Sequence, residues 1–259
     1  MNVLKLATYF LAGRLPGGSR HCVICGGTVH RFMPYMHGWA GAPGLIRALD
    51  VVGSDLDAFE CPRCGSHDRE RHLMLYFRST GMFEWMRGKS VVHFAPEKHL
   101  SRCIMEAGPS YYLKCDLYPR CSDITRMDLL ATGLQAESVD FLIANHVLEH
   151  VDDDLKAIAE ISRVLKPGGR AVLQTPYSGK LRRTWQDDGI VDNASRLQAY
   201  GQEDHVRLYG ADIFERFVSS GLVSRVGFHQ DLLPEVEAKL AGVNAEEPFM
   251  LFERQAIAG

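Results

Sequence analysis

The chain has 259 residues, of which 46% are hydrophobic and 24% charged, and its formal net charge is −3. This composition is typical of a globular protein and excludes a disordered chain. The length fits one large domain, or one standard domain with a small satellite. The near balance of charge disfavours nucleic acid as a partner, because nucleic-acid-binding domains usually carry a marked positive charge.

The first segment, MNVLKLATYFLAGRLPGG, is apolar but does not fit a signal peptide. Lys5 interrupts the apolar stretch and no clear small-residue cleavage site follows. No apolar run approaches the ~20 residues that span a bilayer. We expect a short amphipathic helix that packs on the domain, on a second copy in a homodimer, or at a membrane surface. Its apolar face would consist of Val3, Leu4, Ala7, Phe10 and Leu11.

Seven cysteines form an odd set without the pattern of a secreted disulfide framework. A cytoplasmic, reducing compartment is the simpler interpretation. Four of them lie in two CxxC motifs, each followed by glycine, and residues 26–60 separate the two motifs. Each motif can direct two thiolates at one point, and the glycine leaves room for amide-to-sulfur hydrogen bonds.

Two such motifs predict a closed tetrahedral site of the kind that holds structural Zn²⁺. Its ligands would be Cys22, Cys25, Cys61 and Cys64. Four free cysteines, a redox pair and an iron–sulfur cluster are the alternatives. A histidine could also replace one cysteine, and the candidates are His21, His30, His37 and His67. A closed site does no chemistry itself, so we expect this module to cover or shape the mouth of an active site.

Composition divides the chain into three predicted parts. Residues 1–20 form the N-terminal helix, and residues 21–66 form a loop-rich zinc-binding module. Residues 67–259 form a larger domain in which strands and helices alternate, joined to the module by a helix over Glu70–Phe77. The small module cannot bury enough apolar surface alone, so a metal would supply much of its folding free energy.

The segment Ser138–Pro176 is the most informative part of the chain. Val139–Ala144 is a short apolar run, typical of a strand buried on both faces. The acidic run Asp152–Asp154 predicts the start of a helix, and apolar residues then recur at helical spacing. Pro167–Gly169 is expected to end that helix, and a strand is expected to begin at Ala171. A strand–helix–strand unit implies a parallel sheet with a right-handed crossover.

Two sequences in this segment, Asn145–His150 (NHVLEH) and Val164–Gly169 (VLKPGG), resemble the second half of the class I S-adenosylmethionine-dependent methyltransferases. The resemblance covers roughly residues 88–256. It implies an α/β, Rossmann-like, doubly wound sheet of seven mostly parallel strands in the order 3-2-1-4-5-7-6. The last two strands would be an antiparallel pair over 223–228 and 249–254. It also implies methyl transfer with S-adenosylmethionine as cofactor.

The turn after the first predicted strand, Val91–Phe94, departs from the family. A glycine-rich turn is usual there, because a Cβ atom would push the cofactor away. The family's glycine positions align with Ala95, Glu97 and His99. On the resemblance, Ala95 would still border the cofactor. Glu97 would either meet the positively charged methionine end of the cofactor or remain a solvated carboxylate.

The resemblance implies further cofactor contacts. Asp116, at the end of a strand over residues 111–116, would accept hydrogen bonds from both ribose hydroxyls. Asp128 would accept from the exocyclic amine of adenine. The remaining contacts would come from Met127 or Leu129 on the adenine ring, and from Asn145 and His146 beside the methionine moiety. Glu149 and His150 fill family positions that are mainly structural, with an acid–base pair as the alternative.

Methyl transfer from a sulfonium needs alignment and, for a hydroxyl acceptor, a general base. His205 is the candidate base, in a segment over 202–210 that is dense in polar side chains. Residues 182–188 form a polar insertion that predicts part of the acceptor wall. The predicted acceptor-binding residues are Tyr177, Trp185, Arg207 and Tyr209. In the alternative interpretation, the segment 202–210 is a hydrogen-bonded loop that braces a helix over 211–220.

Three functions are compatible with these patterns. The first is methyl transfer to a small-molecule or sugar-containing acceptor, which the near-neutral charge favours. The second keeps the reaction and takes RNA or protein as substrate, with the zinc module as its reader. The third is a binding or assembly subunit that has lost catalysis, suggested by the altered turn over 95–99.

Overall fold

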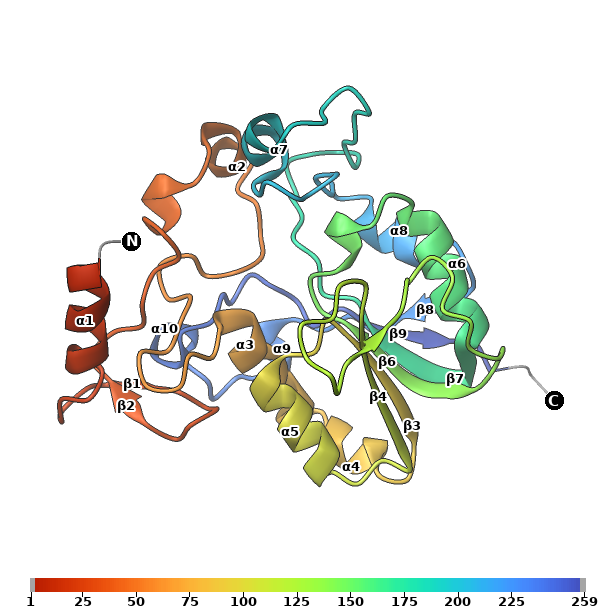
Figure 1. Ribbon diagram of the computed structural model, residues 1–259, viewed down its shortest axis with the longest axis horizontal. Coiled ribbons are helices and arrows are strands. Elements are labelled where there is room, and N and C mark those ends of the chain that lie inside the picture. The colour runs from red at the N-terminus through yellow and green to blue at the C-terminus, as the bar shows by residue number, and fades with distance from the viewer. Residues whose placement is uncertain (1–2, 257–259) are drawn as a thin grey trace.

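A seven-stranded sheet organises the computed structural model, which describes residues 3–256 and the side chains from residue 7 onward (Figure 1). The strand order is β5-β4-β3-β6-β7-β9-β8. The first five strands are parallel, and β9 pairs antiparallel with both β7 and β8. The strands are β3 (Ser90–Phe94), β4 (Tyr111–Asp116), β5 (Thr125–Arg126), β6 (Val139–Ala144), β7 (Leu165–Val172), β8 (Leu222–Ser224) and β9 (Leu251–Arg254). The predicted fold class and strand order are confirmed.

Helices cover both faces of the sheet, as a doubly wound fold requires. One face packs on α6 (Asp154–Val164) and α8 (Ile213–Val218). The other packs on α3 (Asp68–Ser79), α4 (Met82–Met86) and α5 (Lys98–Glu106). Side chains alternate between the two cores along each strand. In β6, for example, Leu142 faces the first core and Phe141 the second.

The predicted end of α6 is wrong by a few residues. The helix begins as expected, because the side chain of Asp153 accepts a hydrogen bond from the amide of Lys156 at 3.0 Å. It stops at Val164, and β7 starts at once and runs through the Lys-Pro-Gly-Gly sequence. The two glycines thus form an irregularity inside a strand. A Cβ atom on Gly169 would lie 3.1 Å from the carbonyl oxygen of Val139 on the neighbouring strand.

The N-terminal region lies to one side of the sheet and consists of short elements (Figure 1). It contains α1 (Val3–Ala12), β1 (Arg20–His21), β2 (Thr28–Val29), a 3₁₀ turn η1 (Trp39–Gly41) and α2 (Gly44–Ala48). The predicted helix α1 is present, but the side chains of Val3 and Leu4 lie outside those described. Phe10 and Leu11 are exposed, while the end of α1 packs closely on the second CxxC turn, since a Cβ on Gly13 would meet Pro62.

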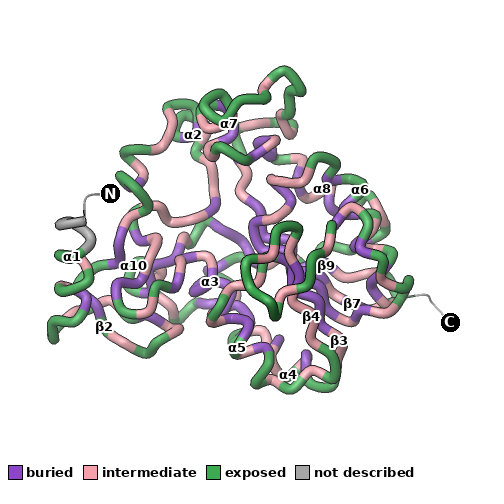
Figure 2. The backbone as a smooth tube through the Cα atoms, in the orientation of Figure 1, coloured by how far each residue is buried: buried purple, intermediate pink, exposed green. Residues whose placement is uncertain are grey.

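The remaining elements connect the sheet to this region. They are η2 (Leu148–His150), α7 (Asn193–Tyr200), α9 (His229–Leu232) and α10 (Ala238–Ala241). Ile46 of α2 is buried against Ala199 and Tyr200 of α7. The central strands are mostly buried, whereas the segments around α2 and α7 are largely exposed (Figure 2). None of the helices in the described part of the chain is long and apolar enough to cross a membrane.

Candidate cofactor site and metal centre

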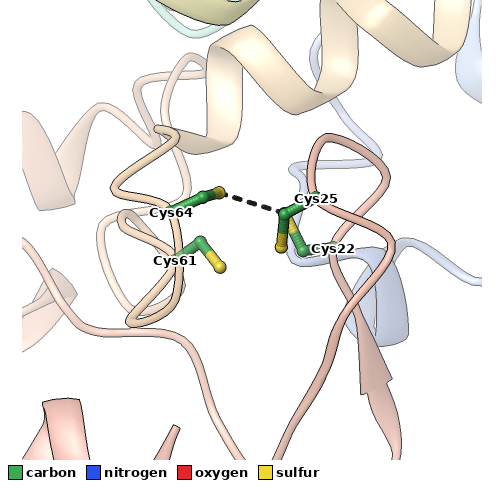
Figure 3. A group of neighbouring side chains, drawn as sticks. All are labelled: Cys22, Cys25, Cys61 and Cys64. Carbon is green, nitrogen blue, oxygen red and sulfur yellow. Dashed lines mark hydrogen bonds between the residues drawn. The ribbon is translucent and has the colours of Figure 1, made fainter. Parts of the chain in front are cut away.

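Four cysteine sulfurs gather in the N-terminal region, each within 4.8 Å of the others (Figure 3). They belong to Cys22, Cys25, Cys61 and Cys64. The two turns that carry them are built alike. The amide of Gly26 donates to the carbonyl of Cys22 at 2.9 Å, and the amide of Gly65 donates to that of Cys61 at 2.8 Å. Both glycines have a positive φ, of 67° and 75°, a conformation that glycine adopts at little cost.

The acid–base properties of this cluster favour a bound cation. Burial raises the pKa of the Cys25 thiol to about 11. Hydrogen bonding within the cluster raises the pKa of Cys61 and lowers that of Cys22, so one thiol ionises at the expense of its neighbours. Four thiolates would therefore not ionise together without a cation between them. The donor set fits a closed tetrahedral site. The four histidines weighed as substitute ligands are not members of the cluster among the described residues.

The side chain of Arg71 fastens the second CxxC turn to the larger domain. It is fully buried on α3 and donates to the carbonyls of Ser66 at 2.6 Å and Ala58 at 2.5 Å. It also reaches the carbonyl of Gly242 at 2.6 Å, on the loop that leads to β9. The predicted module is therefore joined to the sheet domain by buried contacts as well as by the chain.

The turn after β3 follows the path of a glycine turn without containing glycine. Ala95 is in the left-handed region, with a φ of 47°, which costs an L-residue roughly 1–2 kcal/mol. Its amide donates to the carbonyl of Cys115 on β4 at 2.9 Å. This turn therefore keeps the backbone conformation that a glycine would adopt freely.

Glu97 in this turn is held in place by two partners. Its Oε2 lies 2.9 Å from Nε2 of His93, and its Oε1 accepts from Nδ2 of Asn145 at 2.5 Å. The side chain is 14% exposed, so it is not the solvated carboxylate that was the alternative. Burial acts to raise the pKa of Glu97, but the hydrogen bond from His93 prevails and lowers it. An oriented, ionised carboxylate thus lies at the end of β3.

A second carboxylate completes this turn from a distant element. Glu70 of α3 accepts from the amides of His99 and Leu100, at 2.7 and 2.9 Å, at the start of α5. These amides have no partner within a helix, so an external acceptor stabilises its first turn. The sequence interpretation missed this role. Glu70 and His99 are far apart in the chain, and no local pattern marks their contact.

The predicted ribose and adenine residues lie together beyond β4. Asp116 is half-buried at the end of the strand, and its Oδ1 accepts a backbone amide two residues on, at 2.8 Å. The amide of Met127 donates to the carbonyl of Asp116 at 2.9 Å. Asp128 is exposed, whereas Leu129 is buried in the core. Half-buried Met127 is therefore better placed than Leu129 to contact a ligand.

His146 lies just after β6 and between two buried carboxylates. Its Nδ1 is 3.2 Å from Oε1 of Glu149, and its Nε2 is 3.1 Å from Oε1 of Glu247. The other oxygen of Glu247 is 3.4 Å from His72, which in turn meets His229 at 3.0 Å. Burial lowers the pKa of His146, but its two carboxylate partners outweigh burial and raise the pKa to about 9. Both ring nitrogens are then protonated at neutral pH.

Two polar groups at this edge of the sheet lack partners. Oδ1 of Asn145 is buried and accepts no hydrogen bond from any residue that the structure describes. Arg69 of α3 is half-buried and makes no hydrogen bond or ion pair with the residues that the structure describes, although its charge influences the pKa of Glu97 and of His146. The sequence interpretation missed Arg69. Within the charged run DRER, nothing distinguishes it from a solvated helix side chain.

Two of the predicted acceptor residues are engaged inside the protein. Arg207 is buried and donates to the carbonyls of Leu148 at 2.8 Å and Asp152 at 2.7 Å. The hydroxyl of Tyr209 is 2.9 Å from Oδ2 of Asp154, and the side chain is fully buried. These are the contacts of the alternative interpretation, in which the segment over 202–210 braces its neighbours. An acceptor-binding role for either residue stays a prediction.

The other predicted acceptor-side residues are less enclosed. Trp185 is half-buried and pairs with Leu208 through two backbone hydrogen bonds of 2.9 Å. Tyr177 follows β7 and pairs in the same way with Val52 of the N-terminal region, at 2.7 and 2.9 Å. His205 is buried, with Nδ1 at 3.1 Å from the carbonyl of Tyr200 and Nε2 without a partner.

The N-terminal region reaches the carboxyl edge of the sheet through residues 50–57. A Cβ on Gly53 would lie 3.0 Å from Pro176 and 3.9 Å from the ring of His146. The side chain of Asn244 donates to the carbonyl of Gly53 at 2.8 Å. The loop therefore lies over the ends of β6 and β7, as expected of a module that shapes the mouth of a site.

An open parallel sheet binds its ligand at the carboxyl ends of its strands, where the strand order reverses. Here that point lies between β3 and β6, where Glu97 and Asn145 meet. The buried, unpartnered oxygen of Asn145 and the unpaired charge of Arg69 are suited to a polar, zwitterionic ligand group. These features define a Rossmann-like fold with a candidate ligand site at its switch point.

Residues 83–173 match the family described as "Methyltransferase domain". This match includes β3, α5, β4, β6, α6 and β7, so this part of the chain is similar to a methyltransferase domain. A curated relative, an uncharacterized 37.1 kDa protein in transposon TN4556 of Streptomyces fradiae, is 31% identical over 98 residues. That alignment covers 38% of this chain and 24% of the relative, so the chain matches only a minor part of that protein.

Solved structures with a similar fold include two S-adenosylmethionine-dependent methyltransferases. The one from Mesorhizobium loti is 20% identical, with a TM-score of 0.45 over 68% of this chain and 94% of that chain. The one from Archaeoglobus fulgidus is 11% identical, with a TM-score of 0.49 over 73% and 95%. A complex between the Haloferax volcanii Trm112 methyltransferase activator and a methyltransferase gives 13% identity and a TM-score of 0.45, over 73% and 94%.

Proposed function

We propose that the protein transfers a methyl group from S-adenosylmethionine to a small-molecule or sugar-containing acceptor. One observation carries the cofactor part of the proposal: the ionised Glu97, held by His93 and Asn145 at the switch point of a methyltransferase-type sheet. A carboxylate there suits the cationic methionine end of the cofactor. When bound, S-adenosylmethionine would supply an electrophilic methyl group on a sulfonium.

The chain's own residues would position that cofactor. Asp116 would accept from the ribose hydroxyls, and Met127 would pack on the adenine, with Asp128 accepting from its amine. The open oxygen of Asn145 would accept from the methionine ammonium group, and Arg69 would bind the methionine carboxylate. His146, protonated between its two carboxylates, would fix the backbone at the end of β6.

On the acceptor side, His205 is the proposed general base for a hydroxyl acceptor. Its Nδ1 faces a carbonyl and therefore carries the proton, which leaves a lone pair on the unpartnered Nε2. Burial lowers the pKa of His205 to about 4, so the ring is neutral at neutral pH and its Nε2 lone pair is free to face a hydroxyl proton. Tyr177 and Trp185 would line the acceptor space, with Arg207 and Tyr209 supporting it from within.

Four features of the proposal concern the metal, the oligomeric state, the location and the acceptor class. We infer that the four-cysteine cluster holds structural Zn²⁺, which would keep residues 21–66 folded over the sheet edge. A homodimer through the exposed apolar side chains of α1 stays a prediction, as does a cytoplasmic location. Nucleic acid is not the expected acceptor, because the chain has no net positive charge.

The cofactor part is tested by calorimetric titration of S-adenosylmethionine into metal-replete protein. Asp116→Ala should weaken binding roughly 100-fold or more, the loss expected for about two hydrogen bonds to a charged group. Asp123→Ala is the matched control, because Asp123 lies nearby but pairs on the surface with Lys114. Absence of binding by the wild type would contradict the proposal.

The acceptor class is tested with S-adenosylmethionine carrying a radioactive methyl group. The protein is incubated in turn with the small-molecule, RNA and protein fractions of a cell extract. We expect label in the small-molecule fraction, and His205→Gln should abolish it while leaving cofactor binding intact. Label in the RNA or protein fraction alone would overturn the proposed acceptor class.

A further inference from the structure

Near His205 lies a second buried atom without a hydrogen-bond partner among the described residues, on Glu149. A general base alone would not account for both atoms. Glu149, His150 and His205 each offer one donor atom, and the three atoms lie within 4.8 Å of one another. The rings of the two histidines meet edge to face, with centroids 4.7 Å apart. This cluster lies beside the cofactor edge, because Glu149 also contacts His146.

The second nitrogen of each histidine is held by an oxygen atom. Nδ1 of His205 lies 3.1 Å from the carbonyl of Tyr200. Nδ1 of His150 lies 3.3 Å from both the carbonyl and a carboxylate oxygen of Asp204. An oxygen acceptor at Nδ1 places the proton there and leaves the lone pair on Nε2. Histidine ligands of metal ions are typically oriented in this way.

Glu149 is arranged in the same manner. One carboxylate oxygen receives His146 Nδ1 at 3.2 Å, while Oε2 is buried with no hydrogen-bond partner in the described part of the chain. Nε2 of His205 is likewise buried and unpartnered. Glu149 is 1% exposed and His205 4% exposed, so water does not readily satisfy either atom. Native proteins rarely leave buried polar atoms unpaired, so two in one cluster call for a ligand.

The charges in this region also favour a cation. Glu149 and Glu247 are both buried carboxylates, and His146 between them supplies at most one positive charge. His72 is a second histidine partner of Glu247, at 3.4 Å. Glu149 has only His146 as an ion-pair partner among the described residues, and its second oxygen is unpaired. A buried charge of this kind is normally paired or bound to a metal.

We propose that Glu149, His150 and His205 form a second metal site, which binds a divalent transition-metal ion such as Zn²⁺. Two imidazoles and one carboxylate leave a fourth tetrahedral position open, as in catalytic zinc sites and unlike the closed four-cysteine cluster. His150 is the accessible member, with its side chain 32% exposed, so an ion can enter from that side. The metal site does not depend on methyl transfer, and with a metal bound His205 would be its ligand in place of the general base proposed above.

Metal content measured by mass spectrometry tests this site. After equilibration with micromolar Zn²⁺, the wild type should hold two equivalents, one of them in the cysteine cluster. His150→Gln and His205→Gln should each hold one, and His37→Gln, an exposed histidine outside both clusters, should hold two. His150 is partly exposed, so its variant is expected to fold, and circular dichroism checks this.

Titration with Co²⁺ separates the two sites by their spectra. The cysteine cluster should fill first and give strong sulfur-to-cobalt absorption, and a second equivalent should add weaker visible bands from nitrogen and oxygen ligands. Glu149→Gln should weaken only the second phase, by at least about tenfold. One equivalent in the wild type, or two in both histidine variants, would overturn the proposal.

Discussion

Replacing Arg71 by methionine should destabilise the whole protein, because the guanidinium holds three parts of the chain together. It donates to the carbonyls of Ser66, Ala58 and Gly242 at 2.5–2.6 Å, and it lies 4.1 Å above the ring of Phe32. A buried carbonyl that loses its donor costs about 1–3 kcal/mol. Three such losses, less the desolvation that a buried charge no longer incurs, amount to about 3–5 kcal/mol.

Urea unfolding of the metal-replete protein, followed by circular dichroism, measures this loss. Arg78→Met is the matched control, because Arg78 lies on the same helix, is exposed, and makes only one long hydrogen bond, of 3.5 Å, to Val23. The control variant should lower the free energy of unfolding by less than about 0.5 kcal/mol. A cost below about 1 kcal/mol for Arg71→Met would refute the view that the guanidinium is a buried fastener.

Three further outcomes are expected. Removal of the metal by a chelator should expose residues 20–66 to hydrogen exchange and also weaken binding of S-adenosylmethionine, whereas unchanged exchange would argue against a structural metal. Burial raises the pKa of Asp68 to about 7, above its unfolded value of 3.8, so its contribution to stability is present at pH 4 and lost as the pH rises through 7. In urea unfolding, the stability of Asp68→Asn relative to the wild type should therefore rise between pH 4 and pH 7 and stay constant above pH 7. Asp154→Ala should cost about 3 kcal/mol in the same assay, because it strands Arg216, which donates to both carboxylate oxygens at 2.7 and 2.8 Å; a loss under 1 kcal/mol would contradict that role.

The sheet was largely predictable because its strands carry local signals. Val139–Ala144 is apolar throughout, and the structure makes it β6 with the predicted bounds. The end of α6 was not predictable from the same kind of signal. Pro167 and two glycines are typical of a helix end, but pairing of Leu165 with Val139 extends the strand backward through them. Tertiary pairing there outweighs local turn preference.

The candidate site was predictable only where the chain itself brings residues together. Glu97 follows β3 and Asp116 ends β4, two strands of a recognisable pattern, so their positions could be inferred. The other charged residues of this edge could not, because Glu70, Glu247 and Arg69 come from elements far away in sequence. No local periodicity records such contacts, and only the packing of α3 and of the loop before β9 against the sheet edge creates them.

The loop before β9 explains why a closed metal cluster would affect the cofactor site at the carboxyl edge of the sheet. Gly242 accepts from Arg71, which holds the second CxxC turn, and Asn244 holds the loop that lies over His146. Glu247, a few residues further along, is the buried partner of His146. A metal that fixes the CxxC turns therefore also fixes the segment from Gly242 to Glu247. It thereby fixes the carboxylate that favours the protonated form of His146. The cluster contributes no chemistry to the cofactor site, but through this segment it positions Glu247 against His146.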